Sequence, residues 1–210
     1  MCAITVLLTG CFKDEKAAEY KNYIQAAMDA SYLGRNDEYL VVADTTKEAA
    51  EELYEQTAEY LAKAIMKYNF VPYDDISEDT INKYIELSKK SLTKSKYTIN
   101  DGRKVDGVYQ VKVEITPIDI WEATNDEFEE YFEEFTNKYP DLQSMSDDEL
   151  LDVEEEYANK ILEILTPYVE DMHYKDTVSK IVEIQFDDDG LYGISQDDWD
   201  DIDDYVMGIK

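Results

Sequence analysis

The chain has 210 residues, of which 50 are acidic and 20 are basic, and its net charge at pH 7 is −30. This charge excludes nucleic-acid binding through a basic surface and adsorption to anionic lipid through a polybasic patch. Hydrophobic residues make up 44% of the chain, which is enough to form a buried core and therefore excludes wholesale disorder.

The amino-terminal segment is typical of the second half of a signal peptide. Residues 3–9 are apolar and uncharged, and a charged stretch follows shortly after them. Between the two, Leu8, Thr9, Gly10 and Cys11 resemble the lipobox of bacterial lipoproteins. In that motif the cysteine thiol receives a diacylglycerol, and cleavage makes the cysteine the first mature residue. The alternative is a short buried strand in which Cys11 is a small apolar side chain.

The lipobox predicts how the chain is divided and where it is located. Residues 1–10 are expected to be the remnant of a signal peptide, residues 11–16 a lipidated linker, and residues 17–210 a single domain. Two acyl chains, such as palmitate, hold a protein stably at a membrane, where one chain holds it only reversibly. We therefore expect a monomer attached by lipid to the extracytoplasmic face of the cell membrane.

Hydrophobic periodicity predicts three helices in the first half of the domain. The first begins near Lys13 and is interrupted at Gly34. The second follows a capping box, Thr45-x-x-Glu48, and the third follows Ser77 as its N-cap. The expected buried stripes are Tyr20, Ile24, Ala27, Met28 and Ser31 in the first helix, Ala50, Leu53, Tyr54, Thr57, Leu61, Ala64, Ile65 and Tyr68 in the second, and Ile81, Tyr84, Ile85 and Ser88 in the third.

The period of the hydrophobic pattern then changes from about 3.6 residues to 2 residues. This change predicts strands around 97–99 and 109–115, joined through a hairpin turn at Asp106 and Gly107. Two helices follow, with capping boxes Thr124-x-x-Glu127 and Ser146-x-x-Glu149. The expected buried residues are Phe128, Tyr131, Phe132, Phe135 and Tyr139 in the first, and Leu150, Val153, Tyr157, Ile161, Ile164, Leu165 and Tyr168 in the second.

A second hairpin is predicted from Val178 to Ile194, with its turn at Asp189 and Gly190, and a short acidic helix begins at Ser195. Strands and helices do not alternate in the order of a parallel sheet, so a doubly wound nucleotide-binding fold is excluded. The sequence predicts an α+β fold, with helices packed on one face of a curved antiparallel sheet of about four strands.

Several stretches resemble a family of uncharacterised lipoproteins from Gram-positive bacteria, chiefly gut clostridia. The likeness lies in the lipobox, in residues 26–32 (AAMDASY), in residues 95–97 (SKY), in residues 111–121 (VKVEITPIDIW) and in the glutamate-rich helix pair that follows. The resemblance implies a cone like that of the cystatin-like, or nuclear transport factor two-like, superfamily, in which helices wrap a bent sheet around a pocket. It implies no catalytic residues.

The remaining residues offer little catalytic or metal chemistry. The only histidine is His173, the body has no cysteine after Cys11, and no nucleophile elbow or phosphate-binding glycine loop is present. We therefore expect no cofactor apart from the diacylglycerol. One histidine and no free cysteine cannot fill a zinc site, so calcium is the metal that the carboxylates suit, with Asp187, Asp189, Asp197 and Asp201 as candidate ligands. The acidic run at 187–189 does not fit the spacing of an EF-hand, so a solvated turn is expected there.

The sequence thus predicts a lipoprotein whose domain is a non-enzymatic binding or interaction module for an unknown protein or small molecule. One alternative, which the resemblance to that superfamily implies, is an enzyme that performs acid–base chemistry on a small molecule with a buried aspartate and tyrosine inside the cone. It needs a carboxyl whose pKa is raised by burial. A second alternative is an extracytoplasmic solute-binding subunit.

Overall fold

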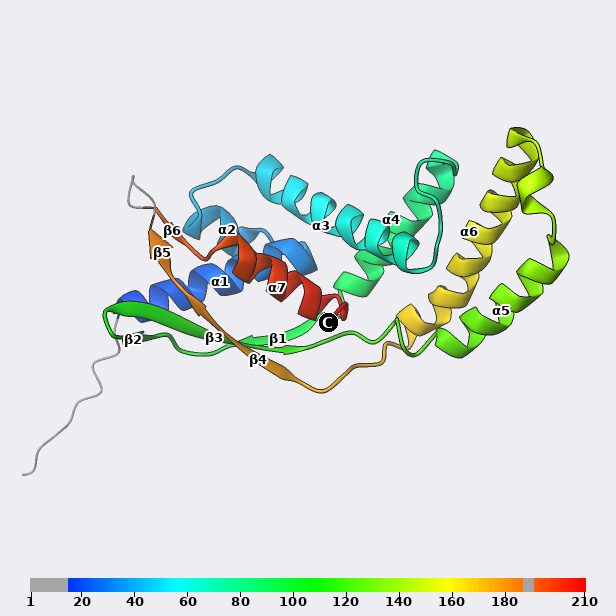
Figure 1. The fold of residues 1–210 in the computed structure, drawn as a ribbon. Helices are drawn as coiled ribbons and strands as arrows, with labels where there is room; N and C mark the ends of the chain where they lie inside the picture. The colour runs from blue at the N-terminus through cyan, green and yellow to red at the C-terminus, as the bar shows by residue number, and fades with distance from the viewer. Residues whose placement is uncertain (1–14, 187–190) are drawn as a thin grey trace, which may run out of the picture.

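The computed structural model of the chain describes residues 15–186 and 191–210. Its helices are α1 (Glu15–Leu33), α2 (Asp37–Val42), α3 (Lys47–Tyr68), α4 (Glu78–Leu92), α5 (Asn125–Lys138), α6 (Asp147–Glu170) and α7 (Gln196–Val206), with a 3-10 turn, η1, at Leu142–Ser144. Its strands are β1 (Lys96–Ile99), β2 (Arg103–Val105), β3 (Val108–Thr116), β4 (Val178–Glu183), β5 (Gln185–Phe186) and β6 (Tyr192–Gly193) (Figure 1). The predicted α+β class is confirmed.

Strand β3 is the centre of a four-stranded antiparallel sheet. β1 pairs with the C-terminal half of β3 and β2 pairs with its N-terminal half, both along the same edge. β4 pairs with the other edge of β3. The β2–β3 hairpin turns at Asp106 and Gly107, where the φ angles are 49° and 93°. Two positive φ angles are what a two-residue hairpin turn of the favoured hand requires, so the predicted turn at Asp106 and Gly107 is confirmed. It joins β3 to β2, however, which was not predicted, and not directly to the predicted strand at 97–99.

The two faces of the sheet differ in polarity. Val111, Val113 and Ile115 of β3 are fully buried, whereas Lys112 and Glu114 between them are on the solvent side. Helices α1–α4 and α7 lie on the buried side, with α1 and α7 directly against β3 and with α3 packed on α1 and α4 (Figure 1). The alternation in the sequence therefore gives the predicted arrangement, with helices on one face and the other face open.

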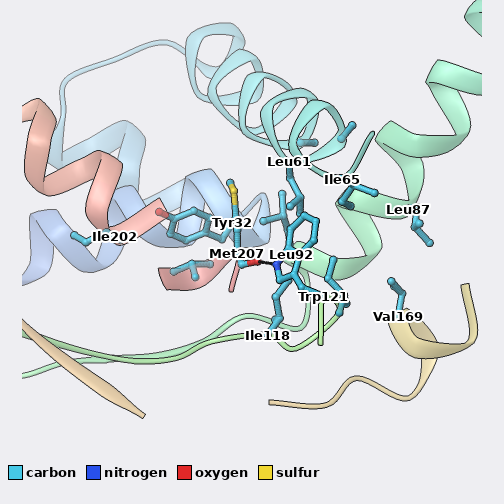
Figure 2. Close-up of a cluster of buried hydrophobic side chains, with 14 of the residues drawn as sticks. Tyr32, Leu61, Ile65, Leu87, Leu92, Ile118, Trp121, Val169, Ile202 and Met207 are labelled. Atoms are coloured by element: carbon cyan, nitrogen blue, oxygen red, sulfur yellow. Dashed lines mark hydrogen bonds between the residues drawn. The ribbon is translucent and has the colours of Figure 1, made fainter. Parts of the chain in front are cut away.

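The core continues from the sheet into the helical layer. Figure 2 shows Leu61 and Ile65 of α3 meeting Leu92 of α4, Trp121 and Met207. These side chains come from segments that are far apart in the sequence. The helical stripes predicted for α1, α3 and α4 supply much of this cluster, because one face of each helix is apolar.

Helices α5 and α6 form a hairpin that extends sideways from the sheet (Figure 1). The prediction that the five aromatic residues from Phe128 to Tyr139 are buried is wrong, because no residue of α5 is buried. Phe128, Tyr131, Phe135 and Tyr139 are partly buried, and Phe132 is 43% exposed. α5 packs on α6, which lies between it and α4, so its aromatic stripe is covered on one side only. In α6, the predicted residues Val153, Tyr157, Ile161 and Leu165 are buried, whereas Leu150, Ile164 and Tyr168 are only partly buried.

The predicted helix starts are confirmed at Ser77, Ser146 and Ser195, whose side chains each accept a backbone N–H of the first turn. The cap of α3 is Thr46, which accepts the N–H of Ala49 at 3.2 Å, and not the predicted Thr45. Thr124 does not cap α5, because its hydroxyl donates to the Ile120 carbonyl instead. Helix α2 was not predicted, because only an interruption of the first helix was expected in that segment.

Candidate functional site

A groove of about 640 Å³ lies beside the C-terminal half of α3. Its volume is within the range of small-molecule binding sites. Four segments line it: α3, the stretch after β3, the stretch before β4, and the turn after α7. The lining residues are Tyr60, Lys63, Ala64, Lys67, Tyr68, Trp121, Glu122, Lys175, Gly208 and Ile209.

One face of α3 forms a wall of this groove. Tyr60, Lys63, Ala64, Lys67 and Tyr68 are spaced at i, i+3, i+4, i+7 and i+8, so they share a single side of the helix. The neighbouring face carries the buried residues of α3 toward the core. The helix therefore has an inner face for packing and a second face that is free for a ligand.

Aromatic rings give the groove an apolar surface. The ring of Tyr68 meets the edge of the Trp121 indole at a centroid distance of 4.8 Å. Trp121 is only 5% exposed, and its Nε1–H donates to the Met207 carbonyl at 2.7 Å, which fixes the orientation of the ring (Figure 2). Tyr68 is 47% exposed and Tyr60 is 51% exposed. The groove thus combines a fixed indole with two accessible phenol rings.

The turn after α7 completes the floor of the groove, and it leaves no room for a side chain at Gly208. Gly208 has a φ angle of 68°, and a Cβ built on it would lie 1.9 Å from the carbonyl oxygen of Ile118. The turn therefore rests directly on the backbone that leaves β3. A side chain at Gly208 would push the two segments apart and would displace Trp121.

Three lysines and one glutamate line the groove. Lys175 forms an ion pair with Glu122 at 2.9 Å, and Lys63 forms one with Glu59 at 2.6 Å. Lys67 makes no ion pair within residues 15–186 and 191–210. Its place in the last turn of α3 is favoured by the helix dipole. The groove therefore presents an excess of positive charge in a chain that is strongly acidic.

A buried tyrosine–aspartate pair lies elsewhere, between α1 and α7. The Tyr32 hydroxyl donates to the carboxylate of Asp203. Burial raises the pKa of Asp203 to about 6, the Tyr32 hydrogen bond opposes this rise, and the charges of Asp200 and Asp204 add to it. Tyr32 itself is fully buried, and burial raises the pKa of its hydroxyl well above the ordinary value.

Most of the predicted site residues lie outside the described part of the chain. These are the lipobox residues Leu8, Thr9, Gly10 and Cys11, and the candidate calcium ligands Asp187 and Asp189. Asp197 is exposed in the first turn of α7. Asp201 accepts hydrogen bonds from Lys180 and Lys210, and these lower its pKa to about 2. Among the described residues, no group of three or more histidine, cysteine or acidic side chains is arranged to hold a metal ion.

The groove was not predicted from the sequence. Ala64 and Tyr68 were assigned to the buried stripe of α3, but they line the groove instead. The signal that could have indicated it is the pair of lysines at i and i+4, Lys63 and Lys67, between Tyr60 and Tyr68. Such a face is too polar to be core and too aromatic to be an ordinary solvated surface.

Comparison with known proteins gives one structural match. No protein-family model and no curated protein matches the sequence. The fold is similar to the crystal structure of a "putative lipoprotein (ycdA)" from Bacillus subtilis, with a TM-score of 0.58 and 13% sequence identity. The two chains share a fold. The match covers 89% of this chain and 55% of the ycdA chain, so this chain spans about half the length of the protein it resembles.

Within the described residues, no helix has the length and the apolar character needed to cross a membrane.

Proposed function

We propose that this chain is an extracytoplasmic lipoprotein, held at the membrane by diacylglycerol on Cys11, and that its domain binds a small molecule in the groove beside α3 without catalysing a reaction. The groove carries the proposal, because accessible aromatic rings, a fixed indole and three lysines line one hollow. Its lining contains no nucleophile paired with a general base.

Two observations support the lipid anchor. The first is the sequence at Leu8–Cys11, which resembles a lipobox. The second is the likeness of the fold to a protein that is itself described as a lipoprotein. Membership of the clostridial lipoprotein family and of the cystatin-like superfamily, and a Gram-positive origin, are part of the same proposal. They rest on the sequence resemblance alone.

The anchor is tested in a Gram-positive host supplied with labelled palmitate. Cys11→Ser is expected to remove the label and to move the protein from the membrane fraction into the soluble fraction. Cys2→Ser is the matched control and should leave both label and location unchanged. A Cys11→Ser protein that stays in the membrane fraction would show that the anchor is not at this thiol.

The groove is tested with N-phenyl-1-naphthylamine, an uncharged dye whose fluorescence rises in apolar sites. Tyr68→Ala removes a wall of the groove, so we expect it to weaken binding by about tenfold, a loss of the size that one aromatic contact supplies. Phe132→Ala on α5 removes an equally exposed ring elsewhere and should change binding less than about twofold. If Phe132→Ala weakens binding and Tyr68→Ala does not, the dye site is on α5 and the proposal fails.

A second candidate function is acid–base catalysis by the Tyr32–Asp203 pair. A buried carboxyl whose pKa is raised to about 6 has the protonation behaviour of a general acid or base. The full burial of Tyr32 favours the binding function, because a catalytic pair must reach its substrate. Asp203→Asn tests whether the pair borders the ligand: the affinity of the uncharged dye should be unchanged if the pair is structural and should change if the pair borders the ligand.

A further inference from the structure

We propose that the groove selects a small amphipathic anion, with a flat apolar body against Tyr68 and Trp121 and a single carboxylate, sulfonate or phosphate at Lys67. This inference rests on the proposed function, since it names the chemical class of ligand for the same groove. It follows from three features of the groove: its charge, the state of its lysines and the shape of its apolar surface.

The charge of the groove differs from that of the molecule. Acidic residues outnumber basic ones 50 to 20 over the whole chain, yet three of the four charged residues lining the groove are lysines. The field of the rest of the surface repels anions, so an anion is attracted only where lysines are concentrated. Because Lys63 and Lys175 are each ion-paired with a glutamate, the excess positive charge is that of Lys67, and this favours an anion at that lysine.

The three lysines differ in their ion pairing, and this difference identifies Lys67 as the binding position for the anion. The Lys63 ammonium is engaged with Glu59 and lies 5.0 Å from the centre of the Tyr73 ring. The Lys175 ammonium is engaged with Glu122. Lys67 has no carboxylate within ion-pair distance among the described residues, although the surface is rich in acids. A ligand anion at Lys67 therefore displaces no existing ion pair.

The opposite end of the groove is acidic, which orients the ligand. Tyr60 lies seven residues before Lys67 on α3, about 10 Å along the helix. Burial raises the pKa of the Tyr60 hydroxyl, and the charges of Asp204, Asp203 and Asp200 raise it further, whereas the ammonium of Lys210, which is paired with Asp204, opposes them. A second anionic group would meet this negative potential. The groove therefore suits a ligand with its charge at one end and an uncharged body.

The shape of the apolar surface suits a flat body. Tyr68 presents an accessible ring next to an indole that is held rigidly by its bond to Met207. A planar ligand buries area against these rings at a reduced entropic cost, because the indole is already fixed before binding. The volume of about 640 Å³ accommodates a molecule of this size but not a folded partner.

The test compares two dyes with the same aromatic body. 1-Anilinonaphthalene-8-sulfonate carries a sulfonate and N-phenyl-1-naphthylamine carries none. We expect Lys67→Gln to weaken sulfonate binding by about threefold and Lys67→Glu by about tenfold, while the neutral dye changes less than twofold. Lys104→Gln, the same charge change on β2, is the matched control and should affect neither dye. Added salt should weaken only the sulfonate.

The outcomes separate the two proposals. If Tyr68→Ala weakens the neutral dye while Lys67→Glu leaves sulfonate affinity unchanged, the groove binds ligands but the anion selectivity is wrong. If Lys67→Glu weakens both dyes equally, the lysine acts through the structure of the groove, and the selectivity is again wrong. If Tyr68→Ala changes the affinity of neither dye, the proposed binding function fails together with this inference.

Discussion

The carboxylate of Glu155, on α6, accepts hydrogen bonds from both the backbone N–H and the hydroxyl of Ser77, each at 2.9 Å. Ser77 is the N-cap of α4, so a negative charge from a distant helix lies at the positive end of the α4 dipole. Burial by itself would raise the pKa of Glu155, but these bonds, with others from Thr80 and Asn159, lower it to about 2. The contact ties the α5–α6 hairpin to the rest of the molecule.

Glu155→Gln is expected to lower the free energy of unfolding at pH 7 by about 1–2 kcal/mol, because the amide loses the charge that the cap binds. Since the pKa of Glu155 is lowered on folding, its contribution is complete above about pH 5 and is lost as the pH falls toward 2. Urea unfolding at pH 7 and pH 3.5 measures this. Glu154→Gln is the control: the pKa of Glu154 is raised by burial and by Asp75, so its removal should not destabilise the protein.

Asp203 should produce the opposite dependence on pH. Its pKa is raised on folding from 3.8 to about 6, so the folded state binds more protons, and stability falls as the pH rises from about 4 to about 6. The size of this loss is about 2–3 kcal/mol. Asp203→Asn removes it and should be at least as stable as the original protein at pH 7. Equal slopes for the two proteins between pH 4 and pH 6 would show that Asp203 is not the titrating group.

Tyr32→Phe tests the same pair by removing the hydroxyl that donates to Asp203. The Tyr32 hydrogen bond opposes the rise in the pKa of Asp203, so removing the hydroxyl should raise that pKa further and extend the pH-dependent loss of stability to higher pH. At pH 7 the variant should lose about 1–3 kcal/mol, the usual cost of leaving a buried polar group without its partner. The pH dependence of urea unfolding distinguishes this from a simple loss of packing, which would not shift with pH.

Gly208→Ala is expected to cost about 3 kcal/mol or more, or to prevent folding, because its Cβ would overlap the Ile118 carbonyl and its φ angle of 68° is unfavourable for alanine. Gly107→Ala provides a comparison. Its φ angle is also positive, at 93°, but nothing lies within 4 Å of the added Cβ. Both variants place alanine at a positive φ angle, but only Gly208→Ala adds a steric overlap. The difference between the melting temperatures of the two variants therefore measures the destabilisation caused by that overlap.

Phe70→Gly should stabilise the protein by about 1 kcal/mol. Phe70 follows α3 with a φ angle of 57°, and Val71 N–H donates to the Met66 carbonyl at 2.9 Å, which is the bond of a glycine-type helix end. The Phe70 ring is 73% exposed, so little packing is lost. Phe70→Ala keeps the strain and should gain nothing. Destabilisation by the glycine variant would mean that the ring makes a contact worth more than the strain.

Short-range signals predicted much of this fold. The Asp106–Gly107 turn, the alternation along β3 and the serine caps of α4, α6 and α7 depend on residues within a few positions of one another, and all are confirmed. The burial of α5 was predicted wrongly, because its amphipathic pattern shows which face turns inward but not whether an inner layer is present to cover it.

The sites could not be predicted in the same way. Tyr32 and Asp203 are 171 residues apart, and no local pattern specifies that α1 and α7 lie side by side. The groove likewise joins α3 to Trp121, Lys175 and Gly208, which meet only in the folded chain. Tyr68 illustrates the difficulty. Its position in the helical repeat is compatible with a core residue and also with a residue on the adjacent face of the helix, which lines the groove.

The place of β4 in the sheet has a consequence for folding. β4 follows β3 by about sixty residues, and α7 follows later still. Until β4 and α7 have docked, one edge of β3 lacks its neighbour and the apolar side of the sheet lacks part of its cover. A chain cut before β4 would leave that edge unpaired beside Val111, Val113 and Ile115 and would aggregate or be degraded. The sheet is therefore complete only when segments from both sides of the α5–α6 hairpin have come together.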